Sequence, residues 1–139
     1  MSIHLVLAAP NLDTLDLLYQ LLDAALGLIR HDLVVAEARS EDELIDRVEL
    51  AIDDVILLDW DLAGPATPDL VRDVLGRNPR LRTMVLLPQA LRQYRETLWD
   101  AGACVSIPKE MIDQEWMSTA LCLMRRAIER ETKLALAFA

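Results

Sequence analysis

The chain has 139 residues and a mass of 15.7 kDa, the size of one ordinary domain with a core of its own. Hydrophobic residues make up 53% and charged residues 27%, a composition that excludes a disordered chain. The 14 Lys and Arg against 23 Asp and Glu give a net charge of −9, so the chain lacks the excess of cations that binding to nucleic acid or to an anionic membrane requires.

Short apolar runs alternate with stretches of helical periodicity along the whole chain. The apolar runs predict strands, at 3–8, 33–38, 55–58, 83–87 and 105–107. The periodic stretches predict helices, at 12–26, 41–51, from Thr67–Pro68 to before Pro79, at about 91–100 and at about 113–135. Ser40 with Glu43 forms a capping box for the second helix, and Gly27 and Gly102 are expected to end the first and fourth.

Five strand–helix units in succession predict an α/β fold, a doubly wound five-stranded parallel sheet with helices on both faces. The chain shows no repeat, linker or low-complexity segment, so residues 1–139 are expected to form a single domain. In such sheets ligands gather at the carboxyl ends of the strands.

Two of those strand ends carry charged residues, Asp59 after the third strand and Lys109 after the fifth. Because an edge carboxylate is partly repelled by nearby Asp61, Asp59→Ala is expected to be tolerated or mildly stabilising. One interpretation of the two charges is a solvent-edge ion pair of small energetic worth. The other is a phosphate-handling pair. The chain has only two lysines, and the position of one of them at this strand end favours the second interpretation.

The segments DVILLDWDLAG after the third strand and AGACVSIPK around the fifth resemble the receiver domains of bacterial two-component response regulators. The resemblance covers the chain from Ile3 to about Arg130. It implies a flavodoxin-like fold with strand order 2-1-3-4-5. It also implies that Asp59 stands where a histidine kinase phosphorylates the family's aspartate, and that Lys109 stands where a lysine contacts the phosphate.

The chain departs from the family where receivers bind magnesium. Receivers carry two adjacent acidic residues after the first strand, and this chain has Ala8 and Ala9 followed by Pro10. Asp59 and Asp61 remain as candidate ligands. Because Mg²⁺ is usually anchored by carboxylates, its affinity should be much weakened, and no other cofactor is expected.

The switch residues of the family are also replaced. Leu87, followed by Pro88, stands where receivers have a Thr or Ser that hydrogen-bonds the phosphoryl group. Ser106 stands where an aromatic side chain normally changes rotamer, and Glu110 replaces a common proline. We therefore expect a degenerate receiver, or pseudo-receiver.

The leading functional hypothesis is a receiver-like signalling module that acts by protein–protein interaction and is not an enzyme. The alternative is a working single-domain response regulator phosphorylated on Asp59. A third hypothesis, a flavodoxin-like small-ligand binder or enzyme, predicts a pocket of several hundred Å³ beside Asp59 and Lys109. No GxSxG, P-loop or GxGxxG motif supports an enzyme.

The resemblance implies a partner face on the fourth helix, fifth strand and fifth helix, which would include Tyr94, Trp99, Trp116 and Met117. The first and last helices carry more apolar residues than one buried stripe requires, so a broad core and a partner surface are both open. A homodimer is a reasonable hypothesis. Two cysteines without a CxxC motif, and no segment apolar enough to span a membrane, favour a cytoplasmic protein.

Overall fold

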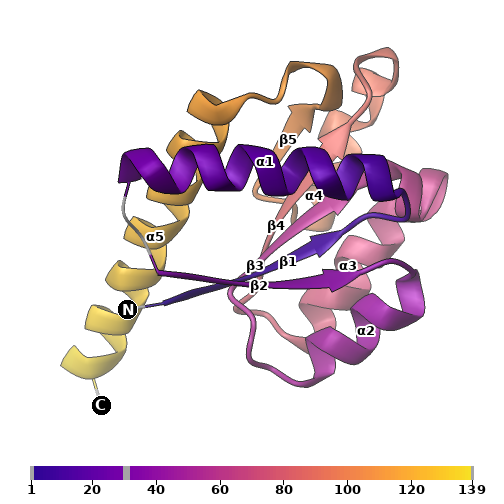
Figure 1. Ribbon diagram of the computed structural model, residues 1–139. Helices are drawn as coiled ribbons and strands as arrows, with labels where there is room; N and C mark the ends of the chain where they lie inside the picture. The colour runs from indigo at the N-terminus through magenta and orange to yellow at the C-terminus, as the bar shows by residue number, and fades with distance from the viewer. Residues whose placement is uncertain (1, 30–31, 139) are drawn as a thin grey trace.

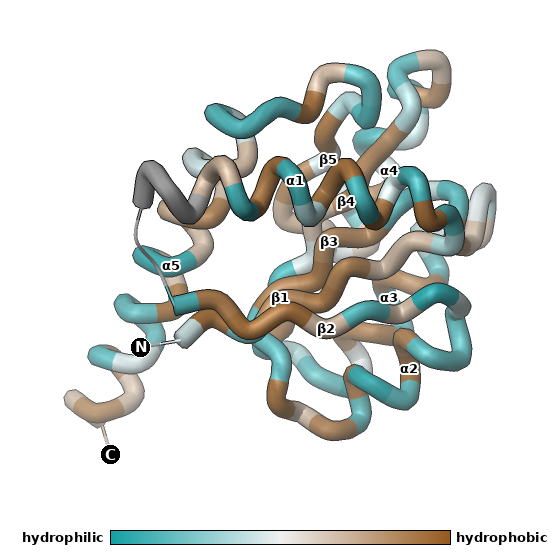
Figure 2. The backbone as a smooth tube through the Cα atoms, viewed as in Figure 1, coloured by the Kyte–Doolittle hydropathy of each residue, from teal (hydrophilic) through white to brown (hydrophobic). Residues whose placement is uncertain are grey.

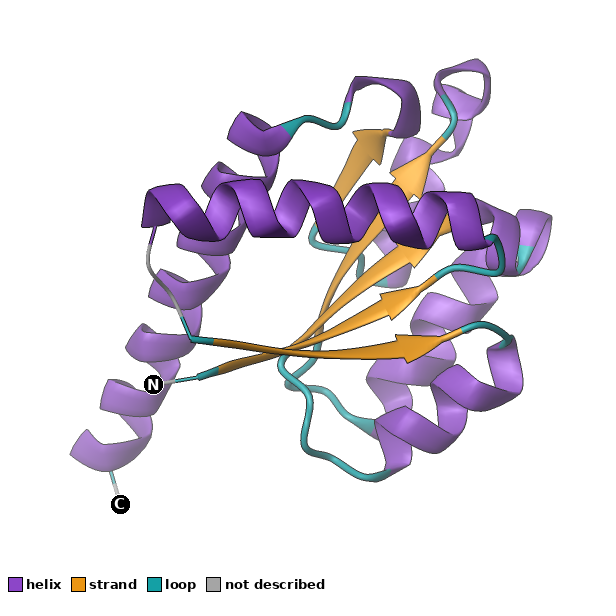
Figure 3. Ribbon diagram, viewed as in Figure 1, coloured by secondary structure: helices purple, strands orange, loops and turns teal. Residues whose placement is uncertain are grey.

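The structure is a computed structural model that describes residues 2–29 and 32–138 (Figure 1). Five parallel strands form one sheet in the order β2-β1-β3-β4-β5, which confirms the predicted doubly wound fold and its strand order. The strands are β1 (Ile3–Ala8), β2 (Leu33–Ala38), β3 (Val55–Asp59), β4 (Arg82–Leu87) and β5 (Val105–Pro108). The arrowheads in Figure 3 lie at one end of the sheet, as parallel strands require.

Helices cover both faces of this sheet. They are α1 (Leu12–Ile29), α2 (Glu41–Glu49), α3 (Thr67–Arg77), α4 (Arg95–Ala101) and α5 (Gln114–Ala137). Short 3₁₀ turns occupy the connections η1 (Trp60–Leu62), η2 (Gly64–Ala66), η3 (Gln89–Tyr94) and η4 (Lys109–Met111). Helices α1 and α5 pack together on one face, and α2, α3 and α4 cover the other.

The core lies on both sides of the central strands. Along β1, Leu5 and Leu7 face the layer of α1 and α5, whereas Val6 and Ala8 face the layer of α2, α3 and α4. Strand β3 is buried over its whole length. Because the central strands are buried on both faces, their sequences are mostly apolar. In Figure 2 they form the hydrophobic centre of the sheet.

The helix ends follow the sequence signals in part. Ser40 Oγ accepts a hydrogen bond from the backbone N–H of Glu43 at 3.1 Å, and Gly102 ends α4 with φ 109°, as predicted. Gly27, in contrast, does not end α1, which continues to Ile29. Thr67 has helical φ and ψ angles of −56° and −43° and is the first residue of α3, and its hydroxyl donates to the carbonyl of Gly64 at 2.6 Å.

One further segment differs from prediction, whereas the last helix agrees with it. The stretch expected as a helix at 91–100 begins as the 3₁₀ turn η3 and becomes α-helical only at Arg95. Helix α5 is capped by Asp113, whose Oδ1 accepts from the N–H of Trp116 at 2.8 Å, and it runs to Ala137. Residues 131–138 are all exposed, so the end of α5 projects beyond the sheet (Figure 1). Within the described residues, no helix combines the length and apolar character needed to cross a membrane.

Candidate functional site

The carboxyl edge of the sheet brings together the two charged residues that the sequence singles out. Asp59 is the last residue of β3, and Lys109 follows β5, with β4 between the two strands. Lys109 Nζ donates to both carboxylate oxygens of Asp59, at 3.1 and 2.9 Å. The Asp59 side chain is fully buried, whereas that of Lys109 is 24% exposed.

Asp61 completes a cluster of three charged groups. Its Oδ2 accepts from Lys109 Nζ at 2.9 Å, and its backbone N–H donates to Asp59 Oδ1 at 3.2 Å. Burial lowers the pKa of Lys109, but its hydrogen bonds to Asp59 and Asp61 outweigh that effect, so the pKa is raised above the ordinary lysine value. The ammonium therefore stays charged and neutralises part of the double negative charge beside it.

The burial of Asp59 corrects one expectation. A carboxylate that is 0% exposed and accepts three hydrogen bonds is not a solvent-edge group. Removing it would leave Lys109 without one of its two partners and open a small hole in the protein. The premise on which Asp59→Ala was expected to be harmless is therefore wrong.

The end of β1 supplies no metal ligand. Ala8 and Ala9 are both fully buried, one in each core layer, and the N–H of Ala9 is bonded to the carbonyl of Ala38 at 3.0 Å. Asp59 and Asp61 could offer carboxylate oxygens, but the ammonium of Lys109 already lies within 3.1 Å of both groups. In the described part of the chain, no three His, Cys, Asp or Glu side chains are grouped to hold a metal ion. These residues do not fit the magnesium site that the fold family implies.

Leu87 and Ser106, the two positions that the resemblance relates to a switch, have different surroundings. Leu87 is buried in the core layer beneath α2, α3 and α4. Ser106 is half-buried on β5, opposite Val85 of β4, and helps to line a pocket of about 90 Å³ with Leu87, Pro88 and Ile107. Neither residue is placed to hydrogen-bond a group on Asp59, since Leu87 has no polar side-chain atom and Ser106 lines a pocket on the α4 side.

The loops at this edge are tied to one another by two further contacts. Glu110 Oε2 accepts from the backbone N–H of Gln89 at 3.0 Å, which joins the loop after β5 to the loop after β4. The rings of Trp60 and Tyr94 lie 4.8 Å apart at a tilt of 47°, which joins the loop after β3 to η3. Sequence reasoning missed both contacts. The only signal for the second was a tryptophan directly after Asp59.

The partner face implied by the resemblance is only partly exposed. Trp99 is 68% exposed and lines a groove of about 620 Å³ between α4 and β5, together with Arg92 and Arg95. Tyr94 is half-buried against Trp60, and Trp116 is half-buried at the edge of the α1–α5 layer. Met117 is fully buried in that layer, so its predicted place on a surface is wrong.

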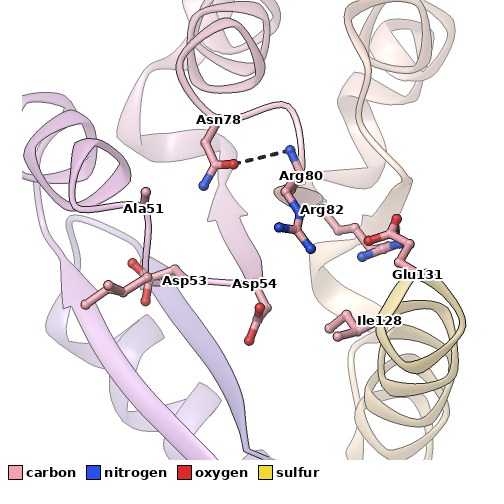
Figure 4. A pocket seen from close by; sticks show the side chains of 9 residues that line it. Ala51, Asp53, Asp54, Asn78, Arg80, Arg82, Ile128 and Glu131 are labelled. Carbon is pink, nitrogen blue, oxygen red and sulfur yellow. Dashed lines mark hydrogen bonds and ion pairs between the residues drawn. The ribbon is translucent and has the colours of Figure 1, made fainter. Parts of the chain in front are cut away.

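Another cavity, of about 270 Å³, lies at the opposite edge of the sheet (Figure 4). Most of its charged groups are engaged in structural contacts. Asp53 is paired with Arg47, Asp54 accepts from the N–H of His4 at 2.9 Å, and Arg82 is paired with Glu131. Neither this cavity nor the α4–β5 groove is lined by Asp59 or Lys109.

Comparison with known proteins identifies the fold. No family model and no curated protein matches the sequence. A CheY-like response regulator receiver domain from Methanospirillum hungatei superposes with a TM-score of 0.75 at 15% identity, over 94% of this chain and 99% of the other. A putative pilus assembly protein from Burkholderia thailandensis gives 0.74 at 17% identity, over 89% and 98%. The receiver domain of a sensor histidine kinase from Pseudomonas aeruginosa, with magnesium coordinated in its active-site cleft, gives 0.69 at 17% identity, over 91% and 97%. The chain therefore has the fold of CheY-like receiver domains.

Proposed function

We propose that this chain is a receiver-like signalling module that binds a protein partner in one conformation, without control by aspartyl phosphate. It would act in the cytoplasm and catalyse no reaction of its own. The observation that carries the proposal is the position of Lys109, whose ammonium is bonded to both Asp59 and Asp61 while Ala8 and Ala9 are buried apolar residues. The ammonium and the two carboxylates at this edge of the sheet therefore pair with one another.

The chemistry of phosphoryl transfer supports this view. A carboxylate that accepts a phosphoryl group needs a cation to neutralise the charge on the transferred oxygens. Here Asp59 is fully buried and Lys109 holds both of its oxygens, so an incoming phosphoryl group would first have to break that pair. The missing acidic pair leaves no alternative anchor for the metal.

The contacts between the loops support a single conformation. A switch needs an element with two states and a ligand that binds them differently. The loop after β4 is held from one side by Glu110 through the N–H of Gln89, and η3 is held from the other by the packing of Tyr94 on Trp60. Leu87 cannot respond to a phosphoryl group through a hydrogen bond.

The α4–β5 groove is the surface that we assign to the partner. Arg92 and Arg95 are exposed there and form no ion pair with any residue that the structure describes, although the chain as a whole is acidic. Trp99 adds an exposed aromatic surface, a residue type enriched at binding hot spots. A partner segment that combines acidic and apolar side chains fits this groove.

The alternative, phosphorylation of Asp59, is tested with acetyl phosphate or beryllofluoride and Mg²⁺. We would measure intact mass and the fluorescence of Trp60, which directly follows Asp59, in a variant whose Trp99 and Trp116 are replaced by Phe. Asp59→Asn is the matched control. We expect no added mass and no Mg²⁺-dependent change in fluorescence. A phosphorylated species that Asp59→Asn abolishes would replace this proposal with the alternative.

A further inference from the structure

Helices α1 and α5 lie side by side on one face of the sheet, and both expose apolar side chains to solvent. On α1, Leu12 and Leu17 are exposed, and on α5, Leu123 and Leu134 are exposed, each by 44–57%. Phe138, just after α5, is 86% exposed. Large apolar side chains exposed on two neighbouring helices are typical of an interaction surface.

The charged residues on α1 are all acidic. Asp13, Asp16 and Asp23 are exposed, and they form no ion pair with any residue that the structure describes. The helix itself contains no Lys or Arg. Helix α1 therefore presents leucines among unpaired carboxylates.

The second half of α5 has the opposite charge. Its two acidic residues are engaged, Glu129 with Arg125 and Glu131 with Arg82. Arg126, Arg130 and Lys133 are exposed, and within residues 2–29 and 32–138 they have no ion-pair partner. They surround Leu134 and line a shallow depression of about 490 Å³.

We propose that a second copy of this chain covers the α1–α5 face in a symmetric dimer, with α1 of each protomer packed on the second half of α5 of the other. A two-fold axis makes such an interface self-complementary, since every contact of one protomer with its partner occurs twice. The acidic α1 would meet the basic end of α5 at both places, and the exposed leucines of both helices would be buried together. Because residues 131–138 project beyond the sheet, they can reach the partner without any change in fold.

An anionic membrane is the competing occupant for the end of α5, because three cations and exposed leucines also fit a lipid surface. The neighbouring helix argues against it. Asp13, Asp16 and Asp23 on α1 would be repelled by anionic lipid, whereas in the dimer they have partners. The dimer also leaves the α4–β5 groove free, so it does not depend on the function proposed above.

Charge reversal tests the dimer directly. In the acid-reversed chain, Asp16 and Asp23 are changed to Lys, and in the base-reversed chain, Arg126 and Arg130 are changed to Glu. By sedimentation velocity at tens of micromolar, we expect the natural chain to be a dimer that weakens as salt is added. Each reversed chain should dimerise about tenfold more weakly or worse, because like charges would face each other.

Mixing the two reversed chains gives the decisive result. In the mixed dimer, the Lys-substituted α1 of one chain would face the Glu-substituted α5 of the other, and the unchanged α1 would face the unchanged α5. Both contacts pair opposite charges, so the equimolar mixture should form a heterodimer. Its recovery also shows that both variants are folded. A control that reverses Asp46 and Asp100 on the other face of the sheet should leave the dimer intact. A natural chain that is monomeric at 100 µM, a mixture that fails to pair, or a natural chain that binds vesicles of anionic lipid as a monomer would each overturn the proposal.

Discussion

Lys109 Nζ lies 2.9 Å from Oδ2 of Asp59 and 2.9 Å from Oδ2 of Asp61, so one ammonium bridges the end of β3 and the turn that follows it. In the receiver domains that the sequence resembles, the residues at these positions handle a phosphoryl group and its metal. In this chain they are bonded to one another, and the contact ties the residue after β5 to the end of β3 across β4. The site should therefore be measurable as a contribution to stability.

Replacing Lys109 with Met should destabilise the protein by about 3 kcal/mol, because it leaves the buried Asp59 carboxylate without its counter-charge. This is the low end of the range for breaking a buried pair, since Lys109 is partly exposed. Urea unfolding measures the change. The matched double variant Asp59→Leu with Lys109→Met should lose less than the two single variants together, because no buried charge is left unpaired. Additive losses would mean that the two residues do not act as a pair.

Alkaline pH should weaken the protein through the same lysine. The pKa of Lys109 is raised above 10.5 in the folded state, so folding holds this proton more tightly than the unfolded chain does. Its share of the stability is fully present below pH 10.5 and is lost as the pH rises through the raised value. The free energy of unfolding, measured from pH 9 to 12, should fall more steeply for the natural chain than for Lys109→Met. Parallel curves would contradict this assignment.

Much of the fold follows from local sequence patterns. The bounds of β1 and β2 were predicted to the residue, because each is an apolar run of strand length closed by a polar residue, a proline or a cap. The stretch at 91–100 was harder, since a 3₁₀ turn and an α-helix share nearly the same apolar spacing. Gly27 failed as a stop signal because glycine is tolerated inside a helix at modest cost.

The sequence predicts which residues form the site, but not how deeply they are buried or which other residues they contact. Asp59 and Lys109 lie at the carboxyl ends of their strands. Because the strands are parallel, these ends meet at the same edge of the sheet, and the two side chains come together. The full burial of Asp59 depends on residues distant in sequence, and so does that of Met117 between α1, α5 and the sheet. The bond from Gln89 to Glu110 joins two loops 21 residues apart, and no local pattern marks it.

Removing the Glu110 carboxylate should loosen the loop after β4. In Glu110→Ala the N–H of Gln89 loses its acceptor, so hydrogen exchange at Gln89 and in η3 should become faster while exchange in β1 and β3 stays unchanged. Glu115→Ala, which removes an exposed carboxylate from the first turn of α5, is the control. Equal exchange in Glu110→Ala and the natural chain would show that this contact does not restrain the loop.

Replacing glycine with alanine should have opposite effects on stability at Gly102 and at Gly76. Gly102 has φ 109°, and a Cβ there would lie 2.2 Å from Leu75 Cδ1, so Gly102→Ala combines backbone strain with a clash and should cost about 2 kcal/mol or more. Gly76 lies inside α3, where a Cβ would meet nothing within 4 Å. Gly76→Ala should therefore stabilise the protein by about 0.5–1 kcal/mol through helix propensity. Urea unfolding of both variants checks the pair, and a Gly102→Ala protein as stable as Gly76→Ala would mean that the turn after α4 is not held in this conformation.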